Sequence, residues 1–184
     1  MPLTPAQLQV LKAHIAGDAE LDAHPDTSDG AFAIAAVLNG PAVPAFRVWQ
    51  TAVPVADVFD NVVWANFTPA DAPDNTVAYS NRSLACQGKQ FNLQTLLVGR
   101  ETINAAKTSI RLGIQDATQQ LPSGAGGATR TGGWPAIQPI LSRDATRAEK
   151  LFATGGAGTT ASPSTMTFEG QLDYQDVQAA RNLG

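Results

Sequence analysis

The sequence predicts a mainly α-helical protein: a bundle of about four to five helices with short β segments and a C-terminal strand–helix extension. Three observations support this fold class. Capping signals precede runs of apolar residues that recur every three or four positions. Gly and Pro follow these runs where a helix has to end. Apolar stretches with the composition of strands are short and few.

The N-terminal third carries the clearest helix signals. Thr4 and Gln7 form a capping box around a proline at the first helical position, which predicts a helix over residues 4–17. A second helix is predicted over residues 28–39, with Ser28 as its cap. Apolar residues surround the axis of this second helix, so we expect burial on every side, by the rest of the fold or by a neighbour.

The rest of the chain alternates amphipathic helices with Gly- and Pro-rich breaks. A helix over residues 83–98 has an apolar stripe of Leu84, Phe91, Thr95 and Val98, which Leu93, Leu96 and Leu97 are expected to widen. The other expected elements are a helical turn in 18–24, an extended stretch in 46–53, a turn of helix from 54, helices over 102–121 and 137–154, a loop in 122–133, a strand in 165–168 and a helix capped by Asp173.

The domain organisation predicted from these elements is one helical domain with a tail. Residues 1–155 form the domain, with an irregular excursion at about 60–80. Residues 156–184 follow a Gly/Thr/Ser-rich linker and are predicted to be a C-terminal docking extension. A chain of 184 residues is long enough to bury a core without disulfides.

The composition favours contact with other subunits. Charged residues make up only 15% of the chain, against about 25% in an average protein. Little charge therefore keeps free monomers apart. Residues 1–74 contain nine acidic and two basic residues, whereas the remainder contains seven acidic and ten basic ones. Such a split suits head-to-tail contacts, although a solvated surface also explains it.

Residues that could perform chemistry are sparse, and we predict no catalytic, cofactor-binding or metal-binding residues. His14 lies within the first predicted helix. Asp22, His24 and Asp26 could hold a metal only with ligands from a second cluster, which the sequence lacks, so an acidic loop is the preferred interpretation. Cys86 has no CxxC partner and is expected to be a small core residue.

Nucleotide, nucleic-acid and membrane functions are not favoured either. Residues 124–127 are glycine-rich but lack the GK[ST] ending of a phosphate-binding loop. Arg143, Arg147 and Lys150 share one face of a predicted helix, where a solvated face or an acidic neighbour is preferred over phosphates. No apolar run approaches the roughly 20 residues of a membrane span, and the N-terminus lacks a signal peptide. A soluble, unexported protein is expected.

Several segments resemble small proteins encoded in the structural gene cluster of tailed bacteriophages, specifically head–tail connector (adaptor or neck) proteins. The matching segments are 3–12 (LTPAQLQVLK), 48–54 (VWQTAVP), 92–100 (NLQTLLVGR), 145–154 (ATRAEKLFAT) and 168–170 (FEG). The resemblance implies a subunit of a twelvefold ring beneath the portal protein. Its partners would be copies of itself, the portal and tail-side neck proteins, with genomic DNA passing through without sequence-specific binding. Such a subunit is assembled in the bacterial cytoplasm and resides at the head–tail junction of the virion.

Two hypotheses follow from this resemblance. Residues 156–184 reach onto the portal or a neighbouring subunit, so their deletion should leave a folded monomer that does not assemble. The acidic first half, including Asp57 and Asp60, lines the channel. The interface residues expected under the first hypothesis, together with the basic helix face, are Phe168, Leu172, Tyr174, Val177, Arg181, Arg143 and Arg147.

Three alternatives remain open at this stage. A capsid decoration (cement) protein would also be small and partner-dependent, but such proteins are usually strand-rich. A tail terminator also forms a ring, typically sixfold, from sheet-containing subunits. A hydrolase using Asp22, His24 and Asp26 would require a bound metal.

Overall fold

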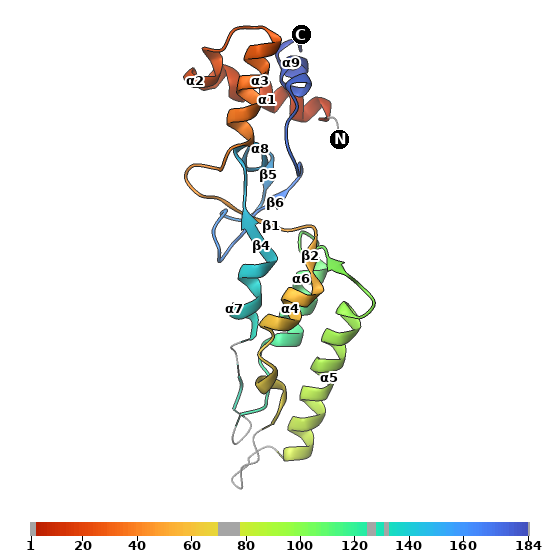
Figure 1. Cartoon of the computed structure of the whole chain (residues 1–184). Coiled ribbons are helices and arrows are strands. Elements are labelled where there is room, and N and C mark those ends of the chain that lie inside the picture. Colours follow the sequence, from red (N-terminus) through yellow and green to blue (C-terminus); the bar gives the residue numbers. More distant parts are fainter. Residues whose placement is uncertain (1–2, 70–77, 125–127, 131–132, 184) are drawn as a thin grey trace. The chain divides into compact units, whose positions relative to one another are not determined.

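The computed structural model of the chain describes residues 3–69, 78–124, 128–130 and 133–183 (Figure 1). The chain is mainly helical with a few short strands, which confirms the coarse fold class. It mixes helices and strands and is not a clean bundle. The chain divides into two compact units, each with its own hydrophobic core. The first unit comprises Met1–Val48 and Asp144–Gly184, and the second comprises Trp49–Arg143.

The first unit brings together both ends of the chain. Its core lies among helices from the N-terminal and C-terminal segments, which pack on one another. Strands β1 (Arg47–Trp49) and β4 (Ser142–Asp144) carry the chain out of this unit and back. Its other elements are α1 (Pro5–Gly17), α2 (Ala19–Asp22), α3 (Ser28–Asn39), α8 (Arg147–Leu151), β5 (Ala153–Thr154), β6 (Thr165–Met166) and α9 (Tyr174–Arg181).

Side-chain caps set where these helices begin. The capping box of Thr4 and Gln7 is present as predicted, and Asp173 caps α9 in the same way with Asp176. The cap of α3 is Thr27, not Ser28 as predicted, because the Thr27 hydroxyl accepts the Gly30 N–H at 3.2 Å. The predicted turn of helix after residue 17 is confirmed as α2.

Helix α3 is buried on one face only. Ile34 and Leu38 are fully buried, whereas Phe32 is 63% exposed. Within the chain, α3 packs against α9 and α8, which cover one face of the helix. Burial of the remaining face by a neighbour stays a prediction.

The segment predicted to be a free docking extension is folded into the first unit. The Gly158 carbonyl accepts the N–H of Arg47 at 2.7 Å, and the Arg47 carbonyl accepts the N–H of Ser164 at 2.9 Å. Gly158 has a φ of +66° and lies so close to the Phe46 ring that a side chain would not fit. The linker is thus a packed loop. The two compact units differ from the predicted division into residues 1–155 and 156–184.

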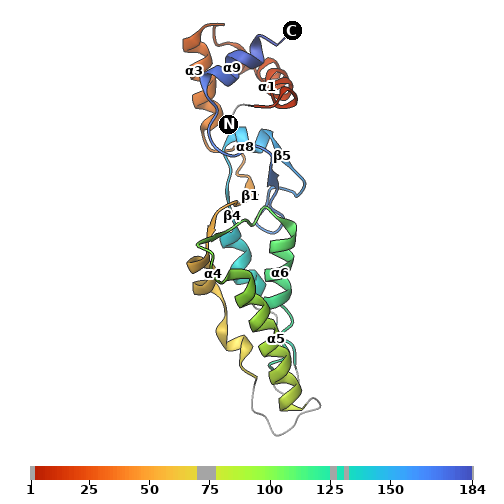
Figure 2. The same cartoon turned by 90° about the vertical axis from the view of Figure 1, so that its right-hand side faces the viewer.

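The second unit is built around a pair of helices that lie side by side (Figures 1 and 2). Within this unit, strand β2 pairs antiparallel with strand β3 in the register Val53↔Ile103 and Pro54↔Thr102. The elements are β2 (Val53–Pro54), α4 (Val55–Asn61), η1 (Trp64–Phe67), α5 (Tyr79–Leu97), β3 (Thr102–Ile103), α6 (Thr108–Thr118), α7 (Gly133–Ile137) and η3 (Gln138–Leu141).

Two predicted helices are shorter than the sequence pattern indicates. The helix expected from residue 102 begins at Thr108, because Thr102 and Ile103 pair with β2. The helix expected over residues 137–154 is interrupted by β4 and restarts at the capping box of Thr146 and Glu149. Arg143 therefore lies in β4, and the predicted basic helix face does not exist.

Other predictions for this part of the chain are met in part. Four apolar side chains within residues 137–154 are buried although the predicted helix is interrupted; they are Leu141, Ala145, Ala148 and Phe152. Within the irregular region of about 60–80, residues 64–67 form η1, and residues 70–77 lie outside the described part of the chain. Residues 125–127 and 131–132 of the predicted loop also lie outside it.

We predict that Gly30→Ala destabilises the first unit. The added Cβ would overlap the Pro25 carbonyl oxygen, so backbone must shift. Overpacking of this kind costs about 1–3 kcal/mol. Thermal unfolding followed by circular dichroism should show a lower Tm. Gly17→Ala is the matched control, since its Cβ would meet nothing within 4 Å. An equal Tm for the two variants would contradict the packing of α3 on residue 25.

Candidate interaction surfaces

The first unit carries an open groove between α3 and the start of α9, with a volume of about 520 Å³. The rings of Phe32 and Tyr174 stack at its rim, with centroids 5.3 Å apart and planes inclined by 18°. The remaining lining residues are Ala35, Ala36, Asn39, Gln171, Leu172 and Asp173. The groove therefore offers aromatic and small apolar surface, a composition suited to a packed protein contact.

Polar contacts hold the C-terminal wall of this groove in place. The Asn39 side chain donates to the Leu172 carbonyl at 3.0 Å and accepts the Leu172 N–H at 2.8 Å. Arg181 donates to the carbonyls of Pro25 and His24 at 2.8 and 2.9 Å. These bonds fix both ends of α9 against the N-terminal helices, so the groove is preformed.

Most of the predicted interface residues in the C-terminal segment serve the core of their own unit. Phe168, Leu172 and Val177 are 8%, 4% and 0% exposed. Phe168 packs edge-on against Phe152 with ring centroids 5.5 Å apart. Tyr174, which lines the groove, is only partly buried and remains accessible to a partner. Sequence reasoning did not single out Phe32 or Asn39, since nothing in the helix pattern shows that α9 packs beside them.

A second hollow of about 510 Å³ on the same unit is lined by charged residues of both signs. Arg147, Lys150 and Asp18 line it together with His14, and Leu21 and Leu38 are among its apolar lining residues. Arg147 lies 3.9 Å from the Glu20 carboxylate, both partly exposed, so this ion pair contributes little to stability. Arg147 is thus a predicted interface residue at the surface, whereas Arg143 belongs to the other unit.

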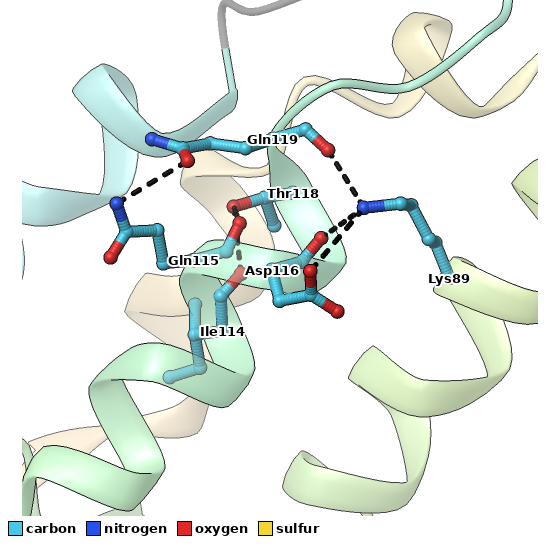
Figure 3. A network of polar contacts seen from close by, with 6 residues as sticks. All are labelled: Lys89, Ile114, Gln115, Asp116, Thr118 and Gln119. Carbon is cyan, nitrogen blue, oxygen red and sulfur yellow. Dashed lines mark hydrogen bonds and ion pairs between the residues drawn. The ribbon is translucent and has the colours of Figure 1, made fainter.

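In the second unit, a polar network joins α5 to the end of α6 (Figure 3). Lys89 Nζ donates to the carbonyls of Asp116 and Gln119 and lies 3.8 Å from the Asp116 carboxylate. The Lys89 charge thus neutralises carbonyls at the helix C-terminus. Thr118 donates to the Ile114 carbonyl at 2.8 Å in the same network. The network directs the lysine toward α6.

Asp22, His24 and Asp26, which the sequence offered as metal ligands, lie at the end of α2 and in the loop that follows it. In that part of the chain, no group of three or more His, Cys, Asp or Glu side chains could hold a metal ion. Asp26 lies 3.7 Å from Arg181, and the His24 carbonyl accepts a hydrogen bond from the same arginine.

Among the helices that the structure describes, none is both long and apolar enough to cross a membrane.

Cys86 is buried, as the sequence predicted, at 1% exposure. Burial raises the pKa of its thiol because a thiolate would lose its hydration, and this outweighs the opposing effect of the nearby Arg130, Arg82 and Lys89. The thiol is therefore protonated and shielded at neutral pH, unlike a catalytic cysteine.

No family model matches the chain, and neither a curated protein nor a solved structure shows significant similarity to it.

We predict that Cys86 in the folded chain reacts with a maleimide at least roughly 100-fold more slowly than in denaturant, since the reaction requires opening of the second unit. Labelling followed by mass spectrometry measures the rate. The control is a chain carrying Cys86→Ala and Ala85→Cys, because position 85 is exposed and should react at once. Equal rates for the two chains would show that α5 does not bury its Cys86 face.

Proposed function

We propose that the chain is a structural subunit of a tailed-bacteriophage virion, a head–tail connector (adaptor or neck) protein that forms a ring with copies of itself beneath the portal. The observation that carries the proposal is the preformed groove with Phe32 and Tyr174 at its rim. A 63% exposed phenylalanine at the rim of an apolar groove is the kind of surface that a protein partner covers. The resemblance of segments 3–12, 48–54, 92–100, 145–154 and 168–170 supplies the virion context.

Two further observations support a connector over its rivals. The mainly helical content fits a connector better than a strand-rich decoration protein or a sheet-containing tail terminator. The charge split along the sequence, with nine acidic and two basic residues over 1–74 and seven acidic and ten basic residues over the remainder, also suits the heterologous contacts from which rings are built.

In this proposal the groove receives part of a neighbouring subunit or of the portal. Burial of a phenylalanine side chain contributes about 1.5–3 kcal/mol, so Phe32 alone can decide whether a ring contact forms. The C-terminal segment contributes by shaping the groove through Leu172 and Tyr174. Because its own apolar residues are core residues, it is not a free arm in this conformation.

The proposal is tested by measuring the mass and the symmetry of the assembly that the chain forms. The purified chain, imaged alone and with the portal, should form a ring, and the resemblance leads us to expect twelvefold symmetry. Phe32→Lys places a charge in the groove and should abolish the ring while leaving the fold intact, because Phe32 is exposed. Leu112→Lys, at a 57% exposed position of α6 in the other unit, is the matched control. A monomer at capsid-wide copy number would contradict the proposal.

Deleting residues 156–184 is not a clean test, contrary to our expectation from the sequence. The deletion removes Phe168, Leu172 and Val177 from the core of the first unit. Loss of these side chains would cost several kcal/mol and unfold the unit, so failed assembly would not report on docking. Point substitutions on the groove rim avoid this problem.

We predict that Asp57→Lys with Asp60→Lys, both exposed on α4, slows DNA release from assembled particles if the acidic first half lines the channel. Lysines bind phosphates, so the effect should weaken with added salt. The control is Glu101→Lys with Glu169→Lys, which changes the net charge equally at exposed positions in the second half. Unchanged DNA release in the Asp57 and Asp60 variant would refute the channel hypothesis.

A further inference from the structure

Helix α5 presents an apolar stripe to solvent. Leu84 and Phe91 of α5 and Val98, the residue at its C-terminal cap, are 71%, 68% and 74% exposed, and they follow one another at intervals of seven residues. The sequence pattern identified this stripe, but the structure buries Cys86, Leu93 and Leu97 on the opposite face instead. Side chains that recur every seven residues lie on one face of a helix, and exposed apolar side chains gathered on one face mark a surface that a partner can cover.

The exposed face of α5 is also uncharged. Arg82 and Lys89 are the charged residues of the helix, and both act on its inner side. Arg82 is fully buried and donates to the Gly124 carbonyl at 3.2 Å. Lys89 is held by α6 through the network of Figure 3. Two copies of this face can therefore approach without repulsion between like charges.

Two polar side chains of the same helix already have hydrogen-bond partners within it. The Thr95 hydroxyl donates to the Phe91 carbonyl at 2.8 Å, and the Gln87 amide donates to the Ser83 hydroxyl at 3.1 Å. Gly88, one turn before Phe91, has open space where a Cβ would be. A partner helix can therefore come close, and a large side chain can enter beside the ring.

The stripe is symmetric about Phe91. Leu84 precedes it by seven residues and Val98 follows it by seven. When two such helices lie antiparallel, Phe91 meets its own copy, and each Leu84 meets a Val98. A surface that matches itself in this way is what a two-fold contact requires, because residue i contacts j and j contacts i.

We propose that α5 of one chain packs antiparallel against α5 of a second copy of the chain, across a two-fold axis beside Phe91. This goes beyond the proposed connector role. A two-fold contact closes a dimer, whereas a ring needs heterologous contacts through other surfaces. A 19-residue helix is about 28 Å long and about 10 Å wide. The area of one face of such a helix is much smaller than the roughly 800 Å² that each partner buries in a standard interface. The dimer is therefore weak and depends on protein concentration.

Sedimentation of the full-length chain over a range of concentrations tests the contact. The wild-type chain should show a monomer–dimer equilibrium. Phe91→Glu places two carboxylates at the axis and should raise the dissociation constant at least tenfold, about 1.4 kcal/mol. Leu112→Glu is the matched control, since Leu112 is an exposed leucine of the same unit outside the stripe. Circular dichroism checks that each variant is folded.

A charge swap tests the antiparallel direction. Leu84→Lys and Val98→Glu should each weaken the dimer. Combined in one chain they should restore it, because every new lysine faces a new glutamate across the axis. In a parallel pair the combined variant would instead oppose like charges twice and remain dissociated, which would overturn the proposed geometry.

The remaining outcomes separate this contact from the connector role. If the Phe91→Glu variant still forms both the dimer and the ring, the α5 contact is overturned and the connector role stays intact. Dimers that Phe91→Glu dissociates, with no ring under any condition, support the contact and count against the connector role. If the wild-type chain stays monomeric at every concentration, or if its α5 face binds a different protein, the proposal that a second copy covers this face is overturned.

Discussion

The apolar helical surface of this chain exceeds what its two small cores can cover, and the rest of the structure follows from that constraint. Each unit holds fewer than 100 residues, so each core accepts one face of each helix that surrounds it. Helix α3 buries Ile34 and Leu38 but leaves Phe32 outside, and α5 buries Leu93 and Leu97 but leaves Phe91 outside. Apolar side chains left in this way are stabilised only by a partner, which is why we read the chain as part of an assembly.

Polar anchors decide which faces are left outside. The amide of Asn39 holds the backbone of Leu172, and Arg181 holds the loop before α3, so α9 cannot move away from the groove without exposing unsatisfied groups. Lys89 has the same role in the second unit, where it ties α5 to α6. A helix that is anchored on its inner side cannot rotate, so its opposite face is left to solvent or to a neighbour.

The two units offer different kinds of contact. The groove beside Phe32 and the charges around Arg147 are unlike surfaces, which favour a neighbour that presents something different. The α5 stripe is uncharged and symmetric about Phe91, which favours an identical neighbour. A chain with both kinds of surface can take part in a closed pair and in a ring through separate residues.

The sequence by itself determined the local structure. The caps predicted at Thr4 and Asp173 both form, because a cap depends on residues within one turn. It also identified the stripe on α5 and the groove residue Tyr174. Only the tertiary structure decided which side of each helix is buried, that residues 156–184 complete the first unit, and that Phe32 lies beside Tyr174. These features depend on contacts between separate segments, such as Lys89 with Asp116 or Asn39 with Leu172, and periodicity within one helix carries no information about them.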